Sequence, residues 1–120
     1  MLDALLVEIS RFIIFTPDVK RLAGFYASTF GLDIVGEADE GWTELNAGAT
    51  NIAFHKTTEQ GTGRDGWTKL VFGSKSVASE RARLEKLGVK MSDVVEFGEI
   101  QLCDGRDPDG NYFQISSRGM

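Results

Sequence analysis

The feature that most constrains the fold of this chain is an order of secondary-structure elements that occurs twice. Periodicity and turn residues predict a strand, a helix and three more strands in each half, over about 6–57 and 67–117. The Gly-rich segment 58–66 is predicted to link the halves. The predicted strands are 6–15, 33–37, 41–46 and 50–56 in the first half, and 67–73, 89–95, 98–104 and 111–117 in the second. We therefore expect a single domain, 1–120, of two βαβββ modules in the α+β class.

Capping and turn residues mark the ends of both predicted helices. Thr16 is the expected N-cap of the first helix, with Asp18 in its first turn, and Ser76 is the expected N-cap of the second. Gly31 and Gly88 follow the last apolar position of each helix, where a glycine commonly ends the helix. Because both helices end in the same way, these residues support a repeated module.

The repeat also predicts which way the side chains face. With a helix on one face of each sheet, the two uncovered faces can curve toward a shared cavity, so we expect a cup-shaped mixed sheet with helices on its outer face. Since strand side chains alternate, Leu45 and Phe54 are assigned to the helix side and Glu44 to the cavity side. The aromatic and polar residues assigned to the cavity are Trp42, Glu44, His55, Trp67, Lys69, Glu99, Gln101, Tyr112 and Gln114.

Arg11 is a charged residue on the apolar stripe of the first predicted strand, together with Ile9 and Ile13. Two interpretations stay open at this stage. The arginine either lies at an edge or interface, with its stem packed and its guanidinium in water, or it enters the cavity and pairs with Glu44.

Composition argues against several classes of function. The net charge is −5, from 13 basic and 18 acidic residues, and the absence of a basic cluster argues against nucleic-acid binding. Apolar runs stay well below the roughly 18 residues that a membrane span needs, and the start of the chain lacks the features of a secretion signal. Cys103 is the only cysteine, which rules out an internal disulfide and a multi-cysteine metal site; as a candidate nucleophile it is weak, because buried thiols are usually inert. A reducing, cytoplasmic location is the expectation.

Together these features resemble the vicinal oxygen chelate superfamily, which includes glyoxalase I, extradiol dioxygenases, fosfomycin resistance enzymes and bleomycin resistance proteins. The resemblance covers about residues 7–117. It rests on Thr16-Pro17-Asp18, Phe25-Tyr26, Phe30-Gly31-Leu32 and the turn Asp107-Pro108-Asp109-Gly110-Asn111. It implies paired βαβββ modules, usually in a homodimer, that form cup-shaped sites. In the metal-dependent members it also implies His, Glu or Gln ligands on the first, third and last strands.

The residues at the corresponding positions of this chain do not suit a metal ion. Carried over by the resemblance, these positions are Arg11, Glu44, Lys69 or its neighbour Trp67, and Gln114. Glu44 is an ordinary ligand and Gln114 a weak one, whereas the two cations repel a divalent metal. We therefore expect no bound metal, with ion pairs of Glu44 to Lys69 or Arg11 in its place. A set of Glu44, His55 and Glu99 is the remaining metal site considered; its geometry would be new for the family, so metal analysis of the purified protein decides between these expectations.

The mixed cavity face supports two functions. The first is binding of a small aromatic or cationic molecule by stacking and cation–π contact, in a dimer cleft of the kind that the resemblance to bleomycin resistance proteins implies. The alternative is a lyase or isomerase of the glyoxalase or epimerase type, in which Glu44 is the general base and Lys69 or Arg11 stabilises an enolate. Trp42 and Trp67 are equally compatible with core or dimer contacts, so the sequence leaves the ligand unnamed.

Overall fold

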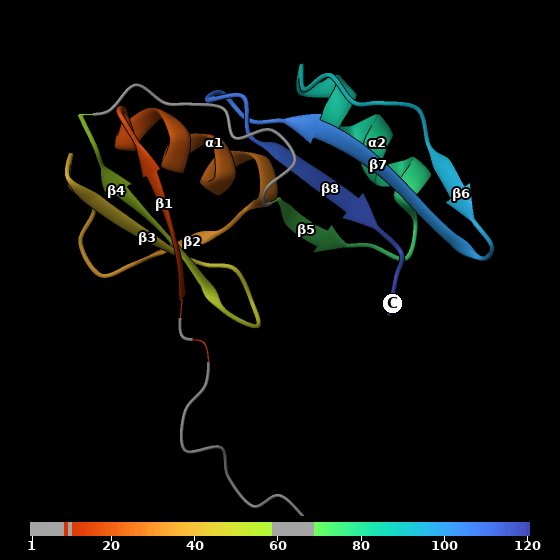
Figure 1. Ribbon diagram of the computed structural model, residues 1–120, viewed down its shortest axis with the longest axis horizontal. Helices are drawn as coiled ribbons and strands as arrows, with labels where there is room; N and C mark the ends of the chain where they lie inside the picture. The colour runs from red at the N-terminus through yellow and green to blue at the C-terminus, as the bar shows by residue number, and fades with distance from the viewer. Residues whose placement is uncertain (1–8, 10, 59–68) are drawn as a thin grey trace, which may run out of the picture. The chain divides into compact units, whose positions relative to one another are not determined.

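The protein is an α+β protein whose chain divides into two compact units, Met1–Gly61 and Thr62–Met120. The computed structural model describes residues 9, 11–58 and 69–120. In the described part of each unit, one helix packs against one four-stranded mixed sheet (Figure 1). The predicted linker 58–66 and the predicted cavity residue Trp67 fall almost wholly outside the described residues.

The first unit follows the predicted order of strand, helix and three strands. Its elements are β1 (Arg11–Thr16), α1 (Val19–Phe30), β2 (Asp33–Val35), β3 (Trp42–Asn46) and β4 (Asn51–Lys56). The strands lie in the order β1-β4-β3-β2, with β1 parallel to β4 and the other pairs antiparallel. The part of the first predicted strand that precedes residue 9 lies outside the described residues.

The second unit repeats the same topology. Its elements are β5 (Leu70–Gly73), α2 (Val77–Lys86), β6 (Val95–Phe97), β7 (Ile100–Arg106) and β8 (Tyr112–Ser116). The strand order is β5-β8-β7-β6, again with the first strand parallel to the last and the other pairs antiparallel. The predicted pair of βαβββ modules is therefore confirmed.

The start of α1 differs from the prediction by two residues. Thr16 remains the last residue of β1, paired with Lys56, and its hydroxyl accepts a hydrogen bond from the Asp18 backbone N–H. Asp18 is the N-cap instead, because its carboxylate accepts a hydrogen bond from the backbone N–H of Arg21 at 3.1 Å. The helix ends as predicted at Gly31, whose φ of +66° is a left-handed conformation that suits glycine.

The predicted strand 89–95 is absent from the described part of the second unit. Met91 makes only an isolated bridge to Gly105, and β6 begins later, at Val95. Side chains of α2 supply the reason: Arg81 donates to the Ser92 carbonyl at 2.7 Å, and Glu85 accepts from the backbone N–H of Met91 at 2.7 Å. These bonds use backbone groups that a longer strand would need for its ladder.

Each unit has a core between its helix and one face of its sheet. In the first unit the Tyr26 ring of α1 stacks on Phe54 of β4, with centroids 5.7 Å apart. Leu45, Phe54, Phe113 and Ile115 are buried as alternation predicted. We call the opposite face of each sheet its helix-free face. Neither described helix has the length and hydropathy of a membrane-crossing segment.

Candidate functional site

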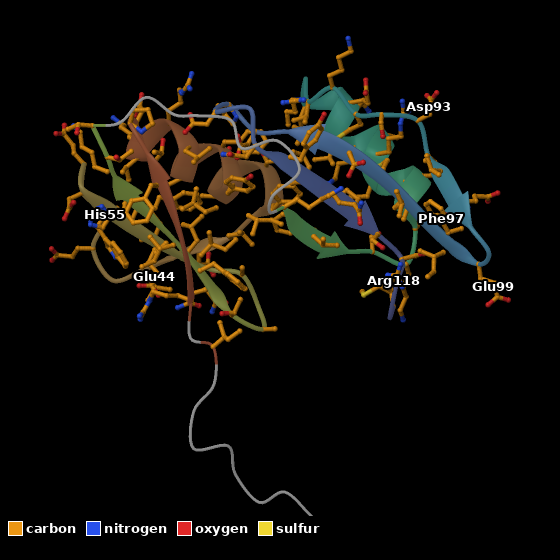
Figure 2. All side chains as sticks on the ribbon, viewed as in Figure 1. Glu44, His55, Asp93, Phe97, Glu99 and Arg118 are labelled. Carbon is orange, nitrogen blue, oxygen red and sulfur yellow. The ribbon has the colours of Figure 1, made fainter. Side chains whose placement is uncertain are left out.

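The helix-free face of the first sheet carries most of the candidate residues in three adjacent rows. Sheet register sets the rows, because residues paired across neighbouring strands project on the same side. From one end of the sheet to the other, the rows are Arg11–Asn51–Asn46–Asp33, Ile13–Ala53–Glu44–Val35 and Phe15–His55–Trp42. Figure 2 shows Glu44 and His55, two of these side chains, on the strands of the first unit.

The Glu44 triad consists of Glu44, Arg11 and Asn51. Arg11 Nε donates to Glu44 Oε2 at 3.0 Å, and Asn51 Nδ2 donates to the same oxygen at 2.8 Å. Glu44 is only 8% exposed, whereas the Arg11 side chain is 43% exposed. Of the two interpretations of Arg11, the structure therefore shows the ion pair with Glu44. Such pairing is physically required, since a buried carboxylate without partners would be strongly destabilising.

The triad fixes the charge state of Glu44. The hydrogen bonds from Asn51 and then Arg11 lower the pKa of Glu44, and they outweigh the opposing effect of burial. The carboxyl is therefore an anion at neutral pH. Both bonds go to Oε2, and no donor within the described residues reaches Oε1. One oxygen of a charged, positioned carboxylate is thus open to a ligand.

An aromatic row, Phe15, His55 and Trp42, lies directly beside the Glu44 row. The ring centroids of Phe15 and His55 are 5.3 Å apart, and those of Trp42 and His55 are 5.9 Å apart in an edge-on arrangement. His55 Nδ1 lies 2.8 Å from the Lys56 carbonyl oxygen, so this nitrogen carries the proton and donates. Phe15 is 62% exposed, an unusual position for a phenylalanine that has a core available in its own unit.

The second sheet carries an equivalent group of a carboxylate, a cation and an amide, made of different residues. The Asp104 triad consists of Asp104, Lys69 and Gln114: Lys69 Nζ and Gln114 Nε2 lie 3.2 and 3.1 Å from Asp104 Oδ1. Each helix-free face therefore holds a carboxylate on its third strand, bonded to a cation from the first-strand region and an amide on the last strand. Lys69 pairs with Asp104, and of the two partners expected for Glu44 the structure shows Arg11.

Tyr112 also lies on the helix-free face of the second sheet, and its ring is covered. The guanidinium carbon of Arg106 lies 4.0 Å from the ring centroid, and Arg106 Nη2 donates to the Tyr112 hydroxyl. The Arg106 guanidinium therefore occupies the face of the Tyr112 ring at which the sequence predicted a ligand.

Two residues predicted to line the cavity do not share the face of Gln114. Register pairs Gln114 with Asp104 and Ile115 with Cys103, so Gln101 projects with Cys103 on the α2 side, where its amide donates to Glu96 at 3.0 Å. Glu99 lies in the turn between β6 and β7, at the end of that hairpin, rather than on a strand (Figure 2). The prediction that Gln101 and Glu99 share a face with Gln114 was wrong. The face of each residue depends on how β7 pairs with its neighbours, and the predicted limits of a strand do not fix that pairing.

Sequence reasoning also missed two members of the triads, Asn51 and Asp104. Asn51 alternates onto the same face as His55, and alignment of the two modules places Asp104 on the strand equivalent to that of Glu44. Both residues were therefore within reach of the alternation and repeat signals. Asn51 is a neutral amide, a residue type that does not suggest a site by itself.

The donor set at the positions that the resemblance assigned to a metal is a poor fit for a divalent cation. Arg11 and Lys69 are cations already bonded to carboxylates, and a metal at Glu44 would have to compete with a guanidinium. Across the ranges 11–58 and 69–120, no three His, Cys, Asp or Glu side chains are grouped closely enough to hold a metal ion.

Comparison with protein families shows which family the chain belongs to. Residues 11–116 match the family model described as the glyoxalase-like domain. The chain therefore belongs to the glyoxalase-like domain family, within the vicinal oxygen chelate superfamily, as its residues suggested. No curated protein compared with the sequence matches it.

Solved structures agree with this fold. A lactoylglutathione lyase from Agrobacterium tumefaciens superimposes with a TM-score of 0.70 at 16% identity, covering 91% of this chain and 92% of that one. A glyoxalase/bleomycin resistance protein/dioxygenase from Nocardioides gives a TM-score of 0.76 at 14% identity, over 96% and 85% of the two chains. A possible glyoxalase from Bacillus cereus gives 0.73 at 16% identity, over 90% and 96%. At these identities the likeness concerns the fold alone.

Proposed function

We propose that this protein binds a small aromatic or cationic molecule on the helix-free face of its first sheet, without a bound metal. The observation that carries the proposal is the Glu44 carboxylate, whose Oε2 is held by Arg11 and Asn51 while Oε1 is open. From the set expected to bind ligand, the proposal uses Arg11, Trp42, Glu44 and His55, to which the structure adds Asn51 and Phe15.

The chemistry of this face suits a cation with aromatic character. A carboxylate whose pKa is lowered keeps its negative charge over the physiological range, so it attracts a cation without needing a proton change. Aromatic faces attract cations and planar rings, and the aromatic row lies one row away from Glu44. Charge and stacking surface therefore lie side by side in one unit.

The lowered pKa favours binding over catalysis by Glu44. A general base that removes a proton next to a carbonyl works best when its pKa lies near the operating pH, and enzymes reach this by raising the pKa of a carboxyl. Asn51 and Arg11 shift the pKa of Glu44 in the opposite direction. The lyase or isomerase interpretation is therefore the weaker one, and the experiment below includes it as an outcome.

A thermal-shift screen with aromatic cations and 2-oxo compounds tests the proposal on wild-type protein and on Glu44→Gln. The matched control is Asp104→Asn, which alters the equivalent carboxylate of the second unit. We expect an aromatic cation to raise the Tm of the wild type and of Asp104→Asn, and to lose this effect in Glu44→Gln. Stabilisation that survives Glu44→Gln would contradict the proposed site. Turnover of a 2-oxo compound that Glu44→Gln abolishes would instead establish the lyase interpretation.

Two further parts of the proposal have their own measurements. Protein purified without chelator should hold much less than one metal ion per chain by elemental analysis, since the donor set is poor; a stoichiometric metal would overturn the metal-free assignment. We also propose a homodimer, as the family resemblance suggests. Light scattering coupled to size-exclusion chromatography should then give twice the 13.2 kDa of one chain, and a monomer would contradict it.

A further inference from the structure

We infer that the ligand of the Glu44 site carries a planar cation with N–H donors, such as an amidinium or guanidinium group attached to an aromatic ring, in preference to a quaternary ammonium. The inference rests on the proposed binding function and narrows it to one chemical class. It follows from two open acceptors, one on Glu44 and one on His55, that share a face of the sheet with Trp42.

Glu44 Oε1 is the first acceptor. Arg11 and Asn51 both bond to Oε2, which leaves Oε1 without a donor from the described residues. A ligand N–H could therefore bond to Oε1 without displacing a hydrogen bond made by the described residues. A quaternary ammonium has charge but no N–H, so it would cover Oε1 without making a hydrogen bond.

His55 Nε2 is the second acceptor. Its Nδ1 donates to the Lys56 carbonyl, so in the neutral ring the proton is on Nδ1 and Nε2 carries a lone pair. Glu44 pairs with Ala53, two residues before His55 on β4, which makes Glu44 and His55 diagonal neighbours on the same face. Diagonal neighbours have Cβ atoms roughly 7–8 Å apart or somewhat less, a span that a forked group with N–H donors on both sides can bridge.

Trp42 supplies the aromatic ring of the site. It lies on β3, two residues from Glu44, and it pairs with His55 on β4. A planar delocalised cation stacks on aromatic rings and still points its N–H groups outward in its own plane. A tetrahedral ammonium cannot do both. Two acceptors and an aromatic ring on one face of the sheet therefore select for shape and for hydrogen bonding, in addition to charge.

The charges on the two helix-free faces explain why we assign the preference for a planar cation to the first unit. Its helix-free face carries Lys69 and Arg106 against Asp104, and Arg106 already covers the Tyr112 ring. The described part of the first face carries two carboxylates, Glu44 and Asp33, against one arginine. A cationic ligand is thus attracted to the first face and repelled from the second.

Isothermal titration calorimetry of the full chain with three probes tests the inference: benzamidine, phenyltrimethylammonium and neutral benzamide. In the wild type we expect benzamidine to bind at least about tenfold more tightly than phenyltrimethylammonium, and benzamide to bind most weakly. His55→Phe keeps a ring but removes Nε2, and it should reduce the ratio between the two cations to within about threefold. Asp104→Asn should bind benzamidine as the wild type does.

The outcomes separate the inference from the proposed function. If both cations bind equally and Glu44→Gln weakens both, the binding site stands and the N–H preference is wrong. If none of the three probes binds, or if Glu44→Gln leaves benzamidine affinity unchanged, the proposed site itself is overturned. The comparison of the two cations needs only wild-type protein, so it holds even where a variant folds poorly.

Discussion

The amide of Asn51 donates a hydrogen bond to Glu44 Oε2 at 2.8 Å from the neighbouring strand, and this bond is the largest cause of the lowered pKa of Glu44. Arg11 makes the second bond to the same oxygen, but its side chain is nearly half exposed. The hydrogen bond from a neutral amide therefore lowers the pKa of this carboxylate more than the hydrogen bond from Arg11 does. The properties of the site consequently depend on a residue that carries no charge.

Replacing Asn51 by leucine tests this relationship. Glu44 loses its larger hydrogen bond, so we expect its pKa to rise and the free energy of unfolding to fall by about 1–3 kcal/mol. Carbon-detected NMR titration of the Glu44 carboxyl measures the first effect, and urea unfolding measures the second. Asp104→Asn is the control and should leave the Glu44 titration unchanged. An unshifted Glu44 titration in Asn51→Leu would show that the amide does not stabilise the anion.

The stability of the protein should depend on Glu44 in a pH-dependent way. The pKa of Glu44 is lower in the folded than in the unfolded chain, so the unfolded chain binds this proton more readily. Its contribution is fully present above the unfolded pKa of about 4.3 and is lost as the pH falls through the folded value. The difference in unfolding free energy between wild type and Glu44→Gln should therefore be larger at pH 7 than at pH 3. Urea unfolding at the two pH values checks this, and an equal difference at both contradicts it.

Gly105 is expected to tolerate no side chain. A Cβ at this position would lie 2.5 Å from Met91 Sδ and 2.8 Å from Cζ of the buried Phe113 ring. We expect Gly105→Ala to lower the free energy of unfolding by about 1–3 kcal/mol. Gly24→Ala is the matched control: a Cβ there meets nothing within 4 Å, and alanine should stabilise α1 by about 0.5–1 kcal/mol. Urea unfolding of both variants should give changes of opposite sign, and a neutral Gly105→Ala would show that Met91 moves aside freely.

Cys103 should react with thiol reagents only when its unit opens. It is fully buried, and burial raises the pKa of its thiol. We expect Ellman's reagent at pH 8 to modify the native protein at least about a hundredfold more slowly than the urea-unfolded protein. Rapid labelling of the native protein would contradict the burial and would revive Cys103 as a candidate nucleophile.

The parts of the structure that the sequence predicted are those governed by local chemistry. Alternation along β3 and β4 placed Trp42, Glu44 and His55 on one face, and the glycine after α1 marked its end. Capping was less certain at the start of α1, because both Thr16 and Asp18 have side chains that can accept a backbone N–H, and strand pairing decided between them.

The parts that could not be predicted depend on partners far away in the sequence. Lys69 pairs with Asp104 because β5 lies beside β8, and Gln101 faces α2 because β7 pairs with β8 in one particular register. The strand predicted at 89–95 does not form, because Arg81 and Glu85 bond to backbone groups that it would need. Alternation and the repeat can place single residues such as Asp104 on a strand, but they do not show which distant residue each of them contacts.

Arg106 over Tyr112 has a consequence for how this pair of modules has diverged. Its guanidinium is a planar cation with N–H groups that lies over the Tyr112 ring of β8. Arg106 itself is two residues along β7 from Asp104, a carboxylate held by a cation and an amide. The second unit thus carries, as part of its own chain, a tethered mimic of the ligand that we infer for the first. In the second module an arginine of the chain itself covers the aromatic ring, whereas the first module is the one for which we propose a ligand from solution.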